Sequence, residues 1–385
     1  MLALVLVCAA LALILALWRL GQRGRYFLHV FQLEGYKTNE YRAWASNRSG
    51  SHVWRLSHTL GLLVIALAAV GLWAGWGAWI VPVALLLYGL AFFSAKLYRS
   101  ARIKKPLAWT DRMKRLRIAV VAWTLLPVVG GILAGFHLGY GADDAFAGWI
   151  ALLAGLWAAD LGAPFWTLLG GYTTKPVENS VQEGFKRQAR VTLAARPVLH
   201  VLGITGSYGK TSVKFIIAEL LKQKYNVLAT PSSYNTPMGI CLVINTKLKP
   251  EHQILLLEMG MRYSGDIEEL CDIAQPHKAV ITSIGVAHLE TMGSIEAIAK
   301  EKAQILEHMK PGGDAILNGD DERVRILSGV SGKQWRVSLE DESAEIYGSD
   351  VSYGKEGVRL IVRDDTGETA EIKAKLLGQH NVINL

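Results

Sequence analysis

The chain has 385 residues, and 51% of them are hydrophobic, a share that is high for a purely soluble protein. Residues 1–172 carry 16 Lys/Arg against 6 Asp/Glu, whereas residues 173–385 carry 25 against 27, so the net charge of +8 belongs to the apolar half and does not indicate nucleic-acid binding. The three cysteines, Cys8, Cys241 and Cys271, are scattered. Their spacing excludes a disulfide framework and a cysteine metal site, and it favours a reducing compartment.

The first apolar segment, residues 2–18, contains no charged residue. A cleaved signal peptide is the alternative interpretation, but no basic residue precedes the run and no small-residue cleavage site follows it, so we expect a retained anchor. Further apolar runs, each near the roughly 20 residues that span a bilayer, lie at 57–76, 79–97, 118–136 and 147–172. Eleven of the twelve tryptophans also precede residue 172, as expected for rings at membrane interfaces. Residues 1–172 are therefore predicted to be a membrane domain of about five transmembrane helices.

The distribution of basic residues predicts the orientation of these helices. Residues 19–56 hold seven Lys/Arg, including Arg19, Arg23, Arg25 and Arg48, and residues 98–117 hold eight, including Lys104, Lys105, Lys114 and Arg117. The links 75–79 and 137–148 hold none. Because basic loops stay on the cytoplasmic side, we expect a multi-pass protein of the cell membrane, with its N-terminus outside and everything after about Tyr172 in the cytoplasm.

One acidic residue, Asp160, lies inside the fifth predicted span, in the stretch "AADLGAPFW". A charge within a membrane segment is a candidate functional group. The alternative, which we favour, is a helix break near Gly162 and Pro164 that lets the carboxylate bond to the backbone.

The composition becomes polar from residue 173, and residues 173–197 are predicted to form an amphipathic connecting helix on the cytoplasmic side. After it, short β-branched runs alternate with helical stretches, a pattern typical of an α/β fold with a parallel, doubly wound sheet. We expect strands at 198–204, 226–229, 253–258, 278–284 and 313–317, with helices at 210–224, 264–274 and 294–309. Residues 334–376 are predicted to form a small antiparallel β subdomain.

The stretch "VLGITGSYGKTSVKF", residues 201–215, leaves the first of these strands and enters a helix near Lys210. The backbone N–H groups of a glycine-rich turn and a helix N-terminus together bind phosphate oxygens. Lys210 would reach the β- and γ-phosphates, and Thr211 would ligate Mg²⁺. The candidate ATP ligands are Gly206, Ser207, Gly209, Lys210, Thr211 and Ser212. The general phosphate-loop pattern requires glycine at 204, where this chain has isoleucine, so a chance glycine-rich turn is the alternative.

Four polar clusters follow other predicted strands, where a parallel sheet gathers its ligands. They contain Glu258, which suits Mg²⁺; His288; Asn235 with Thr236 before a proline-initiated helix; and Asn318 with Asp320 and Asp321. Taken singly, each has an ordinary explanation: Asp321 as a helix cap, His288 as a loop histidine and Asn235 as a turn residue. Their common position after strands favours a single site.

Residues 201–385 resemble the central ATPase domain of the Mur ligases, the ATP-dependent ligases of peptidoglycan precursors. The resemblance rests on six motifs in order: "GITGSYGKTS", "YNTPMG", "EMGMRYSGDI", "SIGVAHLETMGSIEAIAKEKAQIL", "LNGDDERV" and "GQHNVINL". The "EMGMR" and "AHLE" forms are most similar to the branch that adds D-alanyl-D-alanine to UDP-N-acetylmuramoyl-tripeptide. The resemblance implies a P-loop-type domain over 198–385 that activates a carboxylate as an acyl phosphate and joins it to an amine.

The resemblance also implies roles for particular residues. ATP phosphates would lie on the loop, with one Mg²⁺ between Thr211 and Glu258 and a second at His288. Lys302 falls where the family carries a carbamylated lysine that supports this metal; a surface lysine is the alternative. The implied catalytic residues are Lys210, Asn235, His288 and Lys302, and the adenine contacts are Asn318 and Asn384.

Three departures from the family pattern accompany the resemblance. Gln304 stands where many relatives have glutamate, the predicted spans replace the uridine-binding domain, and the sequence ends at Leu385, where a C-terminal ligase domain normally follows. We therefore expect that domain to be absent, or supplied by a separate chain. Besides the soluble precursor and a dipeptide, the open alternatives are a lipid-linked carboxylate substrate and a non-catalytic ATP-binding protein at the membrane.

Overall fold

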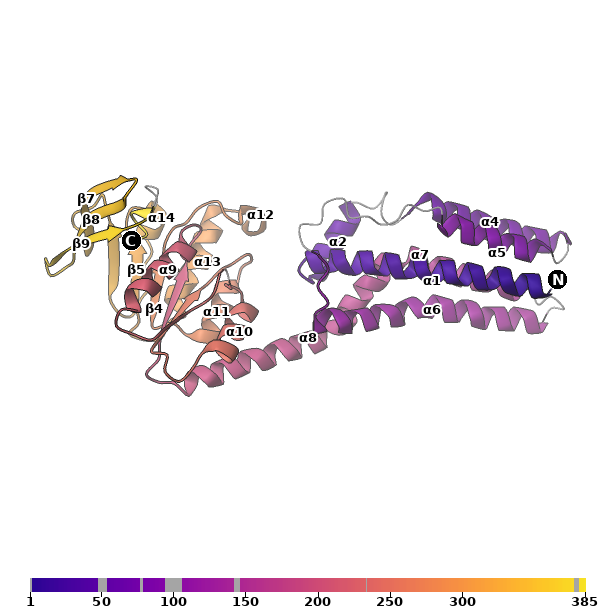
Figure 1. Cartoon of the computed structure of the whole chain (residues 1–385), viewed down its shortest axis with the longest axis horizontal. Helices are drawn as coiled ribbons and strands as arrows, with labels where there is room; N and C mark the ends of the chain where they lie inside the picture. The colour runs from indigo at the N-terminus through magenta and orange to yellow at the C-terminus, as the bar shows by residue number, and fades with distance from the viewer. Residues whose placement is uncertain are drawn as a thin grey trace. The chain divides into compact units, whose positions relative to one another are not determined.

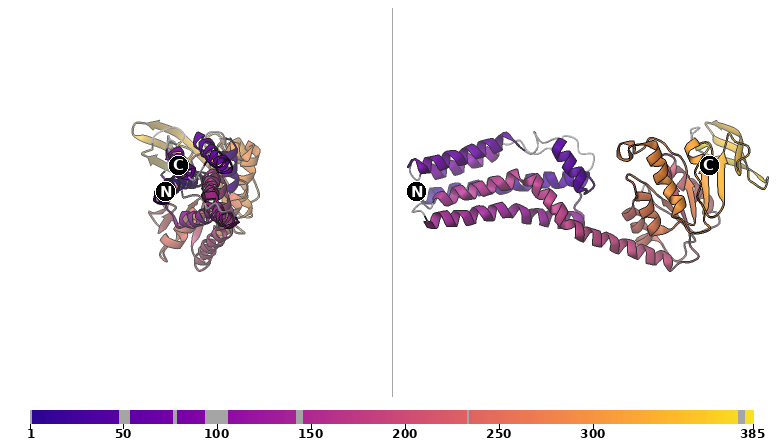
Figure 2. Two further views of the ribbon diagram at one scale, coloured as in Figure 1. Left: turned by 90° about the vertical axis from the view of Figure 1, so that its right-hand side faces the viewer. Right: turned by 180° about the vertical axis from the view of Figure 1, so that it is seen from behind.

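The computed structural model describes residues 2–47, 54–76, 79–93, 106–141, 146–232, 234–376 and 381–385. The chain divides into two compact units, Met1–Ser180 and Val181–Leu385. The first unit is helical and the second is built on a sheet (Figures 1 and 2). Arg48, Lys104 and Lys105, residues 94–97 of the third predicted span and residues 378–380 of the last motif lie outside the described residues.

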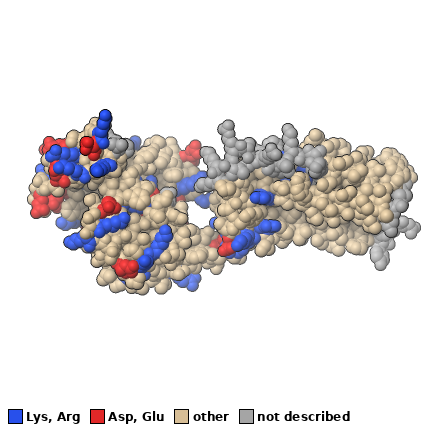
Figure 3. All heavy atoms as spheres, viewed as in Figure 1, with Lys and Arg blue, Asp and Glu red and all other residues tan. Residues whose placement is uncertain are grey.

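Apolar helices make up the first unit. They are α1 Leu2–Leu33, α2 Thr38–Asn47, α4 Leu56–Trp73, α5 Ile80–Phe93, α6 Asp111–Gly141, α7 Phe146–Leu161 and α8 Ala163–Ala194, the last of which continues into the second unit. α1 packs chiefly on α5, and α6 packs chiefly on α7. Figure 3 shows an almost uncharged surface along much of this unit, with Lys and Arg gathered at the end where α8 leaves it.

Three described helices are long and apolar enough to cross a membrane: Ala3–Leu33, Leu56–Trp73 and Asp111–His137. Ile80–Ala91 is shorter, and α7 and α8 pass the same test only as a pair bent by 67°. The predicted span 147–172 is therefore not one straight helix, because α7 ends at Leu161 and α8 starts at Ala163. The predicted connecting helix is the second half of α8. The number of spans and the orientation stay predictions.

Asp160, at the end of α7, is fully buried and bonds to side chains, so the expected backbone partner was wrong. Its Oδ2 accepts from Arg19 Nε at 2.9 Å and lies 2.8 Å from His58 Nε2, while Arg23 Nε lies 3.6 Å from Oδ1. Arg19 also donates to Ser57 Oγ at 2.8 Å. The carboxylate thus joins α1, α4 and α7 inside the bundle, where an ion needs partners because no water solvates it.

The second unit contains a nine-stranded sheet in the order β2-β3-β1-β4-β5-β6-β7-β8-β9. Its strands are β1 His200–Thr205, β2 Val227–Ala229, β3 Ile254–Glu258, β4 Lys278–Ile281, β5 Asp314–Asn318, β6 Gln334–Ser338, β7 Ile346–Gly354, β8 Gly357–Arg363 and β9 Thr369–Ala374. The helices are α9 Lys210–Leu221, α10 Pro237–Lys247, α11 Asp266–Ala274, α12 Leu289–Met292, α13 Ile295–Glu307 and α14 Glu322–Arg325. The five strands and three helices expected before residue 318 are present, with ends shifted by a few residues.

The pairing of β6 corrects the predicted boundary of the antiparallel part. β6 pairs with β5 in parallel, Ala315 opposite Gln334, and so extends the main sheet. Only the β7-β8-β9 meander is antiparallel, and two parallel residue pairs join β7 to β6. A run of alternating residues does not reveal which neighbour a strand will choose, because that choice depends on contacts distant in sequence.

Successive side chains along each parallel strand point to opposite faces of the sheet. Val201 and Leu255 belong to the main core, which also contains residues of α10, α11 and α13. Leu202 and Leu256 face the other side and pack with Ala218 of α9. Helices therefore cover both faces, and all five strands β1 to β5 point their carboxyl ends toward the same edge.

Candidate functional site

The turn between β1 and α9 has a backbone that accepts only glycine at two positions. Gly206 has φ +152° and Gly209 has φ +82°. A Cβ on Gly206 would lie 1.9 Å from Thr282 Oγ1, and one on Gly209 would lie 2.7 Å from Asn384 Oδ1. The glycines at 206 and 209 therefore let the chain turn tightly, and let other loops approach it closely.

Residues after β4 hold this turn in place. Tyr208 N donates to Ser283 Oγ at 2.9 Å, and Thr282 Oγ1 donates to Tyr208 O at 2.5 Å. Ser207 N donates to Ser283 O at 2.8 Å, while Ser207 Oγ accepts from Gly285 N at 2.8 Å. The loop is thus fixed before any ligand arrives, so little conformational entropy remains to be lost when an anion binds.

Lys210 opens α9, and its ammonium folds back over the turn. Nζ donates to Gly206 O at 2.5 Å and to Ser207 O at 3.3 Å. Burial lowers the pKa of Lys210, and the nearby Glu258 carboxylate partly opposes this shift. Ser212 lies exposed in the same helical turn. The first N–H groups of α9 have no partner within the helix, so this terminus suits an anion.

Glu258 ends β3 at the mouth of the loop and collects three donors. Its Oε2 accepts from Thr211 Oγ1 and from Lys214 Nζ, both at 2.9 Å, and its Oε1 accepts from Asn235 Nδ2 at 3.2 Å. Glu258 is only 1% exposed. The structure therefore brings together Thr211, Asn235 and Glu258 as the sequence predicted.

Lys214 is the residue of this cluster that the sequence analysis missed. Its side chain is fully buried, and Nζ also donates to Ser232 O at 2.5 Å. It therefore ties α9 to β3 and to the loop that carries Asn235. A signal was available, because Lys214 lies three residues after Thr211 and so faces the same side of the helix.

His288 and Lys302 approach the loop from α12 and α13. Lys302 is 2% exposed, so the alternative of a surface lysine was wrong. Burial lowers the pKa of its amine to about 7, helped by the charge of Lys210 and opposed by Glu301. His288 has φ +68°, and its pKa is lowered by partial burial and then by the charges of Lys302 and Lys210. The charge of Lys210 thus acts on both His288 and Lys302. Gln304 instead turns toward Glu307, to which its Nε2 donates at 3.1 Å.

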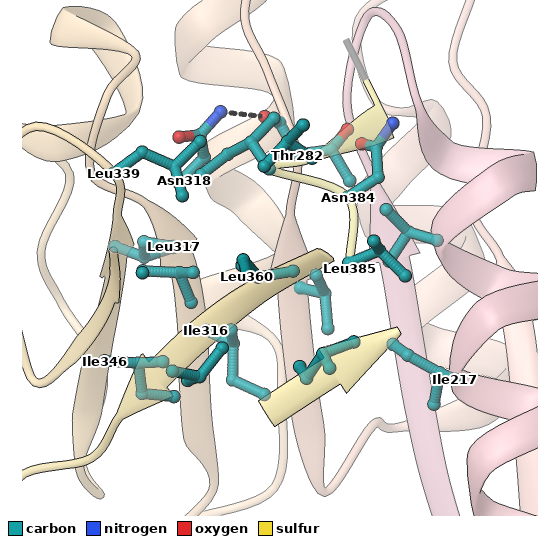
Figure 4. Close-up of a pocket in the computed structure, with 18 of the residues that line it drawn as sticks. Ile217, Thr282, Ile316, Leu317, Asn318, Leu339, Ile346, Leu360, Asn384 and Leu385 are labelled. Atoms are coloured by element: carbon teal, nitrogen blue, oxygen red, sulfur yellow. Dashed lines mark hydrogen bonds between the residues drawn. The ribbon is translucent and has the colours of Figure 1, made fainter. Parts of the chain in front are cut away.

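Asn318 and Asn384 line one pocket of about 240 Å³ beside the loop (Figure 4). Asn318 Nδ2 donates to Thr282 O at 2.8 Å. The rest of the wall is largely apolar and includes Ile217, Ile316 and Leu360. An apolar slot with a few amides at its mouth suits a flat heterocycle.

The two acidic residues after β5 have structural partners. Asp321 caps α14 by accepting from the N–H groups of Arg323 and Val324, and it also accepts from Ile284 N at 2.9 Å. Asp320 accepts from Ser338 Oγ and from Leu339 N. The helix-cap explanation of Asp321 is therefore confirmed, and both residues support the loops around the site.

Together these groups can bind and polarise a chain of phosphates. The α9 N-terminus, Lys210 and Lys302 supply positive charge, while Thr211 and Glu258 supply oxygen ligands. Among the described residues no group of three or more His, Cys, Asp or Glu forms a metal cage.

Comparison with known proteins shows which proteins this domain is similar to. Residues 204–385 match the sequence model of the Mur ligase middle domain. The chain is 35% identical over 189 residues to UDP-N-acetylmuramoyl-tripeptide--D-alanyl-D-alanine ligase of Synechocystis, covering 49% of this chain and 39% of that protein. For the enzyme of the same name from Escherichia coli, identity is 30% over 186 residues, with 48% and 41% covered. The chain thus spans about two fifths of these relatives.

Two solved structures match about half of the chain. The crystal structure of MurF ligase from Thermotoga maritima in complex with ADP has 31% identity and a TM-score of 0.48, covering 53% of this chain and 47% of that one. MurF from Acinetobacter baumannii has 24% identity and a TM-score of 0.49, with 53% and 44% covered.

Proposed function

Because residues 204–385 match the Mur ligase middle domain, we propose that the protein is an ATP-dependent amide ligase of peptidoglycan precursor synthesis. The proposed reaction joins D-alanyl-D-alanine to UDP-N-acetylmuramoyl-tripeptide. One observation carries the proposal: Thr211 Oγ1 and Glu258 Oε2 lie 2.9 Å apart at the mouth of a rigid glycine turn that ends in a helix N-terminus. Support for the substrates comes from the names of the relatives, of which the chain spans about two fifths.

ATP would lie with its phosphates on residues 206–212 and its adenine in the pocket of Asn318 and Asn384. Lys210 would exchange its bonds to the loop carbonyls for bonds to phosphate oxygens. Such charge-assisted bonds contribute more than the neutral bonds they replace, about 1.5–3 kcal/mol each. The same ammonium would then stabilise the negative charge that develops on the phosphoryl group during transfer.

Mg²⁺ fits the first pair of candidate ligands, because the Thr211 hydroxyl and the Glu258 carboxylate are the hard oxygen donors that it prefers. His288 and Lys302 fit a second ion only when Lys302 carries a carbamate, since a neutral amine is a poor ligand for Mg²⁺. A pKa of about 7 leaves much of this amine unprotonated and able to add CO₂. When bound, the ions would neutralise the phosphates and polarise the γ-phosphoryl group.

In the proposed reaction the substrate carboxylate attacks the γ-phosphorus, and ADP leaves. The incoming amine then attacks the acyl carbon, loses a proton and expels inorganic phosphate, which leaves an amide. Asn235 donates a hydrogen bond to Glu258. It would hold the Glu258 carboxylate in position while the substrate binds beside it. Lys210 and the α9 terminus would bind the oxygens that gain charge in both steps.

We further propose that helices of the first unit hold the ligase domain at the cytoplasmic face of the cell membrane. Support comes from the three apolar helices of membrane-spanning length and from the basic segments that flank them. A membrane location also favours the second candidate, a lipid-linked carboxylate substrate. The third candidate is a non-catalytic ATP-binding protein at the membrane.

The test is amide formation by the full chain in detergent, with ATP, Mg²⁺, UDP-N-acetylmuramoyl-tripeptide and D-alanyl-D-alanine, read as phosphate release and as product mass. The Lys210→Ala variant should lower the rate by about 10²–10³. Lys222→Ala, which changes an exposed lysine beyond the other end of the same helix, should leave it unchanged.

Other outcomes separate the alternatives. Turnover with lipid extracts but not with the soluble nucleotide would establish the second candidate and overturn the first. ADP binding by equilibrium dialysis, without turnover on any substrate, would leave only the ATP-binding protein. Absence of ADP binding would contradict all three.

A further inference from the structure

A groove of about 400 Å³ runs between α1 and α6 in the helical unit. The two helices lie antiparallel, because Gln32 near the end of α1 exchanges two hydrogen bonds with Ala108 just before α6, at 2.9 and 3.0 Å. Figure 1 shows them side by side. The walls are apolar and include Leu13 and Leu17 from α1, and Val121 and Leu125 from α6.

Two glycines of α1 keep the groove open. Gly21 and Gly24 line it one helical turn apart, and a Cβ added at either would meet no atom within 4 Å. Elsewhere in the bundle, glycines permit helices to touch; Gly155 of α7, for example, lies where a Cβ would be 2.4 Å from Pro127 O. Gly21 and Gly24 thus border space that no described residue fills.

The part of the groove between Leu13 and Arg25 matches one leaflet of a bilayer in length. Along α1 the lining of the groove extends from Leu13 to Leu28. The stretch from Leu13 to Arg25 is roughly 18 Å long at the helical rise of 1.5 Å per residue. Half of the hydrocarbon core is about 15 Å thick. A single hydrocarbon chain can therefore lie along the groove with its headgroup beside Arg25.

Arg25 and Arg117, at the same end of the groove, differ from the neighbouring arginines in their ion pairs. Arg19 and Arg23 pair with Asp160, and Arg112 and Arg115 pair with Glu178. Arg25 and Arg117 line the groove and form no ion pair with any described carboxylate. The Arg117 guanidinium carbon lies 5.3 Å from the centre of the Trp109 ring, a cation–π contact that does not use its N–H groups as hydrogen-bond donors.

We propose that this groove binds a membrane lipid with a phosphate headgroup. The phosphate lies at Arg25 and Arg117, and the hydrocarbon chain lies along Gly21 and Gly24 toward Leu13. Arginine suits this role because its fork of N–H groups matches phosphate oxygens. The inference rests on the proposed membrane location and is independent of the ligase reaction, so failure of one leaves the other standing.

The experiment measures lipid retention by the full chain in nonionic detergent, using native mass spectrometry. The probes are dioleoyl phosphatidic acid and dioleoylglycerol, which share their hydrocarbon chains and differ in the phosphate. We expect the phosphatidic acid to bind at least about tenfold more tightly, because each hydrogen bond to a charged group contributes about a tenfold factor or more.

Two variants test the two parts of the groove separately. Arg25→Gln with Arg117→Gln should abolish the preference for phosphatidic acid, and Arg42→Gln, which changes an exposed arginine of α2, should preserve it. Gly21→Leu fills the groove and should release both lipids, whereas Gly184→Leu, at another helical glycine with open space, should not. Equal retention of the two probes by the wild-type chain would overturn the proposal, as would a preference that survives the double arginine substitution or lipid binding that survives Gly21→Leu.

Discussion

Substitution of Lys214 by methionine tests how the Glu258 carboxylate is held in position. Lys214 and Glu258 are both buried, with side-chain exposures of 0% and 2%, and their charged atoms are 2.9 Å apart. Methionine keeps most of the side-chain volume but removes the charge, so Glu258 would remain buried without its cation. Removing one partner of a buried pair costs about 3–5 kcal/mol, chiefly because the other charge is left uncompensated.

The lost free energy would make local opening of α9 and β3 more frequent. At about 1.4 kcal/mol per factor of ten, the loss corresponds to amide exchange faster by about two to three and a half orders of magnitude in peptides from these elements. The assay is hydrogen–deuterium exchange of the full chain in detergent. The matched control is Lys222→Met, since Lys222 pairs with Glu219 on the exposed side of the same helix, where such a pair contributes about 0–1 kcal/mol.

A double-mutant cycle with Glu258→Gln gives the decisive result. The double variant removes both charges, so its cost should be smaller than the sum of the single costs by about 0.5–3 kcal/mol, the range for residues in contact. The reasoning is refuted if the two costs simply add, or if Lys214→Met exchanges no faster than Lys222→Met.

Three further predictions concern other parts of the molecule. Gly209→Ala should lose more stability and more ADP affinity than Gly265→Ala. Both glycines have positive φ (+82° and +89°), but only a side chain at Gly209 would also collide with Asn384. Urea melts and calorimetric titration measure the difference, and equal losses would contradict the prediction. Lys302 should form a carbamate with ¹³C-bicarbonate above pH 7 and lose it below about pH 6, because the lowered pKa leaves its amine neutral only at the higher pH. ¹³C NMR measures the carbamate signal. A signal that persists in Lys302→Arg would come from another group and contradict the prediction. The same shift means that the folded domain gains stability as pH rises from about 7 toward the unfolded-state pKa, since the unfolded chain binds the extra proton. Asp160→Asn should destabilise the helical bundle by about 3–5 kcal/mol, whereas the exposed Asp111→Asn should have little effect on thermal inactivation in detergent.

The local features of this protein follow from the sequence. The turn from Gly206 to Gly209 is recognisable because only glycine tolerates its backbone angles, and because β-branched residues before it and helix formers after it define its setting. Asn235, Glu258 and His288 were found by the same reasoning, since the carboxyl ends of parallel strands lie at one edge whatever the details of packing. The apolar helices are equally evident, because the sequence contains long apolar runs with few charged residues.

Only the tertiary structure decided which polar groups are buried, which strands pair with each other and which charged groups form ion pairs. The sequence does not show that Lys214 and Lys302 are buried. Burial makes Lys214 the partner of Glu258 and lowers the pKa of Lys302 to about 7. Asp160 accepts a hydrogen bond from Arg19 of α1 rather than from its own backbone. Strand β6 pairs with the parallel strand β5 rather than belonging to the antiparallel meander. In each case the deciding contact joins segments far apart in the chain, and its free energy depends on the exclusion of water by the whole fold, which no local pattern encodes.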